Sequence, residues 1–210
     1  MPSDGLAPRE RALVGVSVAL ATRRAARIET AMRTAVRDAE PGEVEEVVLQ
    51  SYLFLGYPAA LEGFRIWREI AGGEPTPLVE DTERCARRGE ALVRKIYGPP
   101  HERLRDNIRT LHPDMERWMV EEGYGRVLGR PGLDLVAREL SVASLLAVLD
   151  VPRQLYAHAR GALRVGASPE QVGEALEIAY EASEPAAEES ARKTWRDVRE
   201  RHLRTPQDRR

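Results

Sequence analysis

Three consecutive helix patterns occupy residues 131–180 and constrain the fold more than any other part of the chain. Apolar residues recur at helical spacing through this stretch, and Gly166 ends the second pattern. The third pattern then begins with a good N-cap, Ser168, followed by Pro169 in the first turn and Gln171 to close a capping box. Short connections between helices make neighbours antiparallel. The sequence therefore predicts an all-α fold, an antiparallel helical bundle.

The composition agrees with a soluble helical protein. The 210 residues suffice to bury a core, and aromatic residues, which favour strands, make up only 5%. A net charge of −2 provides no general attraction to nucleic acid. The longest apolar run, Val142 to Leu149, is far too short to cross a bilayer. We therefore expect neither a nucleic-acid partner nor a membrane-spanning segment.

Cysteine and histidine usage excludes several classes of site. A single cysteine, Cys85, cannot form an internal disulfide and fits a reducing cytoplasm. The first fifteen residues have no long apolar segment, so we expect no signal peptide and a cytoplasmic location. His101, His112 and His202 are scattered without ligand spacing, and no glycine-rich phosphate loop is present. We expect no metal and no cofactor.

Two segments of the chain resemble each other. Residues in 9–73 match residues in 137–203 at a constant offset, which becomes one residue longer after the second helix of each segment. Because Trp is rare, the match of Trp67 with Trp195 carries the most weight. The other matched positions are Arg11, Leu13, Ile28, Arg33, Ala35, Val44, Glu46, Tyr52 and Arg68 with Arg138, Leu140, Leu155, Arg160, Ala162, Val172, Glu174, Tyr180 and Arg196. Chance similarity between two Ala- and Arg-rich helical segments is the alternative.

The repeat predicts the organisation of the chain. We expect an N-terminal degenerate repeat (residues 1–73, with a loose lead-in over 1–8), a connecting helical segment (74–136), a C-terminal repeat (137–203) and a disordered tail (204–210). Within the connecting segment, a helix over 112–124 should be followed by a loop over 125–133. Each repeat alone has a small core, so we expect one fused domain.

Glu139 and His158 are the candidate catalytic residues. They lie on consecutive helices of the C-terminal repeat, and His158 shares an inward-facing stripe with Leu155 and Ala162. A carboxylate beside an imidazole fixes its tautomer, and such a pair can transfer a proton at neutral pH. The alternative is a core histidine that is simply satisfied by hydrogen bonds.

Several short pieces, in this order and spacing, resemble the carboxymuconolactone decarboxylase family, which includes the alkylhydroperoxidase D proteins. The pieces are Arg130-Pro131-Gly132-Leu133-Asp134, Arg138-Glu139-Leu140, Gln154-Leu155-x-x-His158, Gly161-Ala162-Leu163 and Gly166-Ala167-Ser168-Pro169-Glu170. The resemblance covers about residues 94–180, with a weaker match over about 9–72. It implies an alkylhydroperoxidase D-like fold with two tandem repeats in one chain.

The resemblance also bears on the chemistry. The thiol-dependent branch uses a Glu, a Cys-x-x-Cys and a His, and Glu139 and His158 match the first and the last. Val151 and Gln154 stand at the two cysteine positions, so the thiol pair needed for peroxide reduction is missing. A peroxiredoxin activity is therefore only a family label here. In the N-terminal repeat, Ala12 and Ala31 stand where Glu139 and His158 would be, so that repeat has no such pair.

The cysteine-free branch implies a decarboxylase-like lyase that acts on a small carboxylated, lactone-type substrate. Arg138, and with less support Arg130, are candidates to bind a substrate carboxylate, because arginine binds carboxylates through two parallel hydrogen bonds. Tyr124 and Tyr156 are further candidate donors, although packing is the favoured role of both. Single-repeat relatives form rings, so a fused chain is expected to be a homotrimer. The alternative function is a non-catalytic oligomeric scaffold or small-molecule binding protein.

Overall fold

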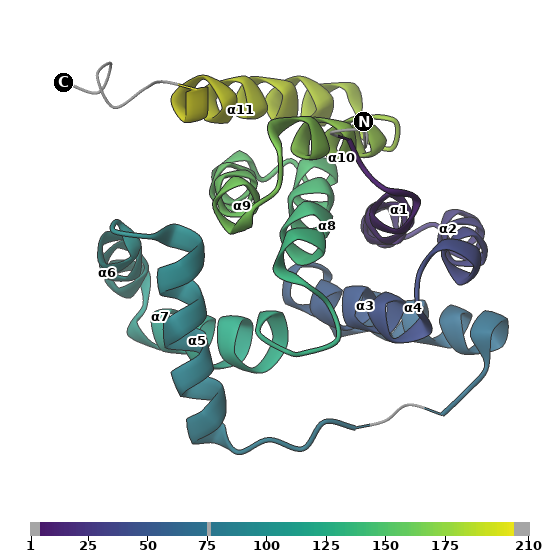
Figure 1. Cartoon of the computed structure of the whole chain (residues 1–210), viewed down its shortest axis with the longest axis horizontal. Coiled ribbons are helices and arrows are strands. Elements are labelled where there is room, and N and C mark those ends of the chain that lie inside the picture. Colours follow the sequence, from purple (N-terminus) through teal and green to yellow (C-terminus); the bar gives the residue numbers. More distant parts are fainter. Residues whose placement is uncertain (1–4, 75–76, 204–210) are drawn as a thin grey trace.

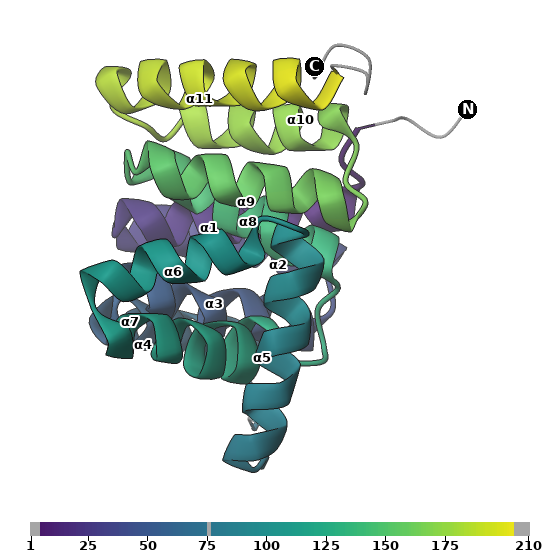
Figure 2. The same ribbon diagram turned by 90° about the vertical axis from the view of Figure 1, so that its left-hand side faces the viewer.

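The computed structural model describes residues 5–74 and 77–203, and within these ranges the predicted all-α fold is confirmed (Figure 1). In Figure 2 most helices lie in stacked layers, with α5 running across them. The helices are α1 (Pro8–Thr22), α2 (Ala25–Asp38), α3 (Pro41–Leu55), α4 (Tyr57–Ala71), α5 (Thr82–Tyr97), α6 (His101–Leu111), α7 (Pro113–Trp118), the π-helix η1 (Met119–Leu128), α8 (Leu135–Val148), α9 (Pro152–Val165), α10 (Pro169–Tyr180) and α11 (Pro185–Leu203).

Helices α1 and α8 form the centre of the molecule and pack against each other. Both are mainly apolar on all sides, which is typical of a helix that is surrounded by protein. The residues from Ala12 to Ala21 of α1 are nearly all buried, and so are those from Ala137 to Ala147 of α8. At their contact, the Ser17 hydroxyl donates a hydrogen bond to the Ser141 carbonyl at 2.8 Å. The other helices pack around this central pair.

The four helices before the connecting segment and the four after it pack in the same pairs. Helix α1 contacts α2 and α3 as α8 contacts α9 and α10, and α2 contacts α4 as α9 contacts α11. Among the ion pairs of the described residues, two that join the halves correspond to each other: Arg11 binds Glu174 at 2.6 Å, and Arg138 binds Glu46 at 2.7 Å. These are the matched arginines and glutamates of the sequence repeat, with their roles exchanged between the halves. Such reciprocity is what a two-fold axis produces.

The connecting segment differs from the sequence prediction after Trp118. A loop was predicted over 125–133, but η1 continues to Leu128, so the prediction was wrong over 125–128 and is confirmed over 129–133. The glycines serve close packing instead: a Cβ on Gly125 would lie 2.3 Å from the Cys85 carbonyl oxygen, and one on Gly89 would lie 2.0 Å from the Val120 carbonyl oxygen. The backbones of α5 and η1 therefore touch where they cross.

The lead-in is also better anchored than predicted. Leu6 is buried, and its backbone N–H donates to the Glu174 carboxylate at 3.1 Å. Residues 1–4 and the predicted tail, 204–210, lie outside the described residues. None of the helices in the described ranges is both long enough and apolar enough to span a membrane.

Candidate functional site

The structure brings Glu139 and His158 together in the C-terminal half. Glu139 Oε2 lies 2.9 Å from His158 Nδ1. Helix α8 is fixed at its start by the Asp134 side chain, which accepts a hydrogen bond from the Ala137 N–H, and α9 begins at Pro152. Because α8 and α9 pack side by side, their inward faces carry the two side chains to one point. Both residues are buried, Glu139 at 2% and His158 at 6% exposure.

The hydrogen bond fixes the role of each ring nitrogen of His158. A carboxylate accepts, so Nδ1 carries the proton that it donates to Glu139. Among the described residues, Nε2 has no hydrogen-bond partner. It is also not fully buried, so it is partly accessible. This nitrogen is therefore the one available to exchange a proton with another molecule.

Two neighbours shape the surroundings of the pair. A Cβ on Gly161 would lie 2.6 Å from Glu139 Oε2, so only glycine leaves space for the carboxylate against α9. The Phe54 ring of α3 meets the His158 ring edge to face, with centroids 5.8 Å apart. The N-terminal half thus supplies one wall of a site whose polar residues belong to the C-terminal half.

A pair of tyrosines lies close to this site. The Tyr97 and Tyr124 hydroxyl groups are hydrogen bonded to each other. Burial raises the pKa of Tyr124 well above its usual value, and the nearby charges of Tyr97 and Glu139 add to this. Burial likewise raises the pKa of Tyr97, again with a contribution from Glu139. Both tyrosines therefore stay protonated at neutral pH, and since one hydroxyl donates to the other, the pair has one remaining O–H to donate elsewhere.

The two arginines predicted to bind a substrate carboxylate bind Glu46 instead. Arg138 is 1% exposed, and its Nη2 lies 2.7 Å from Glu46 Oε2 and 2.9 Å from the Arg130 carbonyl oxygen. Its Nη1 donates to Gln50 at 3.2 Å, and Arg130 Nε lies 2.9 Å from Glu46 Oε1. Burial lowers the pKa of Arg138, while Glu46 opposes that effect. Both guanidinium groups are engaged in this buried network, which joins the two halves.

The two positions that the sequence analysis compared with a Cys-x-x-Cys pair hold no thiol. Val151 is the N-cap of α9, and Gln154 is exposed one turn later. Cys85 is buried on α5, with Arg88 Nη2 3.8 Å from its sulfur. Within the described ranges, no group of three or more His, Cys, Asp or Glu residues is placed to hold a metal ion.

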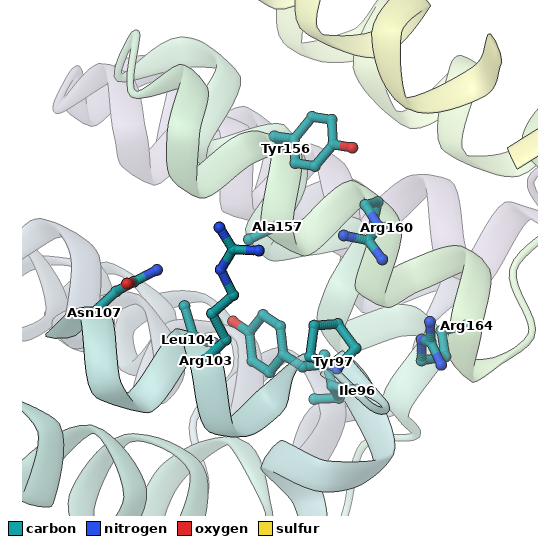
Figure 3. Close-up of a pocket in the computed structure, with 10 residues that line it drawn as sticks. Ile96, Tyr97, Arg103, Leu104, Asn107, Tyr156, Ala157, Arg160 and Arg164 are labelled. Atoms are coloured by element: carbon teal, nitrogen blue, oxygen red, sulfur yellow. The ribbon is translucent and has the colours of Figure 1, made fainter. Parts of the chain in front are cut away.

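A cavity of about 230 Å³ lies between α9 and the α5–α6 connection (Figure 3). Tyr97 forms part of its lining, so this cavity lies next to the tyrosine pair. Arg103 enters from α6, and Arg160 and Arg164 enter from α9. None of these three arginines was predicted from the sequence as an anion-binding residue. A signal was present, because Tyr156, Arg160 and Arg164 recur at the four-residue spacing of one helix face.

The N-terminal half has an open cavity at the counterpart of the Glu139–His158 site. This cavity, of about 320 Å³, is lined by Ala12 and Ala31, the two residues that stand at the Glu and His positions. Leu6, Gly15 and Thr34 are further lining residues. The N-terminal counterpart therefore has space but lacks the acid and the imidazole.

Comparisons with known proteins agree with this architecture. The model of the carboxymuconolactone decarboxylase family matches residues 113–197. The chain is also 28% identical over 149 residues to a protein named Peroxisomal protein 2 from Schizosaccharomyces pombe, a match that covers 67% of this chain and 68% of that protein.

Proposed function

On the premise that residues 113–197 belong to the carboxymuconolactone decarboxylase family, we propose that this protein is a decarboxylase-like lyase that acts on a small carboxylated, lactone-type substrate. The observation that carries the proposal is the hydrogen bond between His158 and Glu139 at 2.9 Å. It leaves Nε2 of His158 as the nitrogen that can exchange a proton. Glu139 acts as the positioning residue.

The proposed reaction needs a proton donor more than any other group. When the bond between the substrate carbon and its carboxylate breaks, carbon dioxide leaves and the electron pair stays on the carbon. A protonated His158 then delivers the proton on Nε2 to that carbon, and a proton from solvent restores the imidazolium. Glu139 stabilises the positive charge on the ring and holds its orientation through Nδ1. No thiol and no electron transfer enter this scheme.

Isotope incorporation tests this proposal. The purified protein is incubated in heavy water with a panel of carboxylated five-membered lactones, and carbon dioxide release and product deuteration are measured together. We expect one deuterium at the carbon that loses the carboxylate, in step with carbon dioxide release. A protein that binds these lactones but releases no carbon dioxide above the buffer rate would contradict the proposal.

A non-catalytic scaffold or small-molecule binding protein is the second candidate. The burial of both Glu139 and His158 and the Phe54 ring against the imidazole favour it, since these are also features of a satisfied core histidine. A role of His158 in proton transfer is favoured by its Nε2, which has no partner among the described residues. The cavity that Tyr97 lines, between α9 and the α5–α6 connection, also favours it. A thiol-dependent peroxidase is not proposed, because Val151 and Gln154 replace the thiol pair. A cytoplasmic location stays a prediction.

The pseudo-symmetric ion pairs support an internal duplication. Arg11–Glu174 and Arg138–Glu46 are equivalent under the sequence repeat, and each ion pair joins one repeat to the other. We propose that residues 1–73 and 137–203 descend from one repeat, with 74–136 inserted between them. Only the second copy keeps the Glu–His pair.

We also propose that the chain forms a homotrimer. Large apolar side chains are exposed on two surfaces, Tyr57 and Leu61 on α4, and Leu111, Met115 and Trp118 around α7. Exposed apolar groups of this size often mark contacts between chains. Light scattering should give about three times the chain mass of 23.5 kDa. Replacement of Leu61 and Trp118 by lysine should dissociate the assembly, and a wild-type mass of one chain would contradict it.

A further inference from the structure

We propose that the cavity between α9 and the α5–α6 connection binds a small dianion with a flat apolar body, and that Arg103, Arg160 and Arg164 hold its charged groups. The inference rests on the proposed function, because it assigns the binding of the substrate anion to this cavity and not to Arg138 and Arg130.

The charge of the cavity is the first argument. Its lining includes three guanidinium groups and no acidic side chain. Among the described residues, none of the three arginines forms an ion pair, whereas many other arginines of this chain bind a carboxylate. Guanidinium groups bind carboxylate or phosphate oxygens through paired hydrogen bonds. Three cations facing one small space therefore favour a ligand with at least two negative charges.

The shape of the cavity is the second argument. Ile96, Pro100, Leu104 and Ala157 give it apolar walls, and Tyr97 and Tyr156 add aromatic surface. Its volume, about 230 Å³, is below the range typical of drug-sized ligands. A small planar molecule fits such walls, with its charged groups directed to the arginines.

Local packing shapes the cavity. Gly98 ends α5 with a positive φ of 64°, and a Cβ there would lie 2.0 Å from Arg164 Nη1. Glycine therefore allows both the turn and the close approach of the Arg164 guanidinium. Arg201 of α11 donates to the Tyr156 hydroxyl at 3.0 Å, and the Arg160 guanidinium lies over the same ring, 5.7 Å from its centroid. Figure 3 shows Arg103 extending from α6 toward α9, across the cavity.

Tyr97 connects this cavity to the Glu139–His158 pair. Tyr97 lines the cavity, and its hydroxyl is hydrogen bonded to that of Tyr124. The nearby charge of Glu139 contributes to the raised pKa of both tyrosines. A ligand anchored by the arginines would therefore lie against Tyr97, whose hydroxyl is bonded to Tyr124.

Calorimetric titration at low salt tests the proposal without turnover. The probes are terephthalate, a flat dicarboxylate; phenyl phosphate, a flat phosphate dianion; and terephthalamide, which has the shape of terephthalate but no charge. We expect at least one dianion to bind and the diamide not to bind. The comparison of the two dianions identifies the anionic group. Binding should weaken with added salt, because the arginines are exposed.

Variants assign the binding to the named arginines. Arg103→Ala, from α6, and the double change Arg160→Ala and Arg164→Ala, from α9, should each weaken dianion binding by about tenfold or more. Arg94→Ala removes the same charge from an exposed position outside the cavity and should leave binding within about twofold. Equal weakening by Arg94→Ala, or no binding of either dianion to the folded wild-type protein, would overturn the proposal.

The same titration separates this inference from the proposed function. His158→Ala should bind the dianion as the wild type does, because His158 does not line the cavity. Dianion binding without any decarboxylation would retain the binding site and reject the proposed reaction. Decarboxylation that is unaffected by Arg103→Ala and by the double variant would reject the binding site and retain the reaction.

Discussion

Replacement of Arg138 by alanine is expected to lower the free energy of unfolding by about 3 kcal/mol or more. The side chain is almost fully buried and provides a charged partner to Glu46 and hydrogen bonds to Gln50 and the Arg130 carbonyl. Its removal leaves Arg130 as the remaining ion-pair partner of Glu46 among the described residues. It also takes away the hydrogen-bond donor of the Gln50 side-chain oxygen. A buried charge that loses a partner destabilises the fold far more than an exposed one. Urea denaturation followed by circular dichroism measures the change.

Arg11→Ala is the matched control, because the repeat places Arg11 in the equivalent position. Its ion pair with Glu174 has side-chain exposures of 53% and 41%, so solvent screens it and the loss should stay below about 1 kcal/mol. Equal losses for the two variants would contradict the role assigned to burial. The measurement also tests the earlier prediction for Arg138: a residue that only held substrate would raise KM and leave the free energy of unfolding unchanged.

The helices were predictable because their determinants are local. The Ser168 hydroxyl accepts a hydrogen bond from the Gln171 N–H, and the Gln171 side-chain oxygen accepts one from the Ser168 N–H, as the capping box predicts. Gly166 ends α9 in the left-handed conformation that glycine favours. Such signals lie within one turn of the helix end that they fix, so the sequence alone reveals them.

The π-helix was not predictable in the same way. Gly125 looks like a loop residue in sequence, but its role depends on contact with the Cys85 carbonyl on a helix far earlier in the chain. Gly89 makes the complementary contact with Val120. A glycine that permits close helix crossing and one that permits a turn have the same sequence signature. Only the tertiary contact separates the two cases.

The positions of the arginines were not predictable for a related reason. Arg138 immediately precedes Glu139 in the sequence, but adjacent residues on a helix point in different directions. Glu139 therefore turns toward His158 of α9, while Arg138 turns toward Glu46 of α3. The arginines that surround a cavity beside the tyrosine pair come from α6 and α9, and nothing in the local sequence shows that these helices face each other. Long-range packing decides which of many arginines share a space.

Replacement of His158 by alanine is expected to lower the decarboxylation rate by about 10²- to 10⁴-fold, the usual contribution of a positioned general acid. The observation behind this value is that His158 donates through Nδ1 to Glu139, whereas its Nε2 has no hydrogen-bond partner in the described ranges. Glu139→Gln should cause a smaller loss, because an amide oxygen still accepts from Nδ1 but no longer stabilises a positive ring. Single-turnover assays with saturating substrate measure the rate of the chemical step.

Chemical rescue distinguishes proton transfer from simple packing. The alanine variant leaves a space of imidazole size beside Glu139 and Phe54, so added imidazole should restore part of the rate in a saturable way. His158→Phe fills that space without a nitrogen, and its rate should stay low whether or not imidazole is present. A core histidine with only a packing role predicts the opposite order, since phenylalanine would then preserve activity better than alanine plus imidazole. Equal turnover by the wild type and by a folded His158→Phe variant would therefore assign the Glu139–His158 pair to the structure of the bundle and remove it from the chemistry.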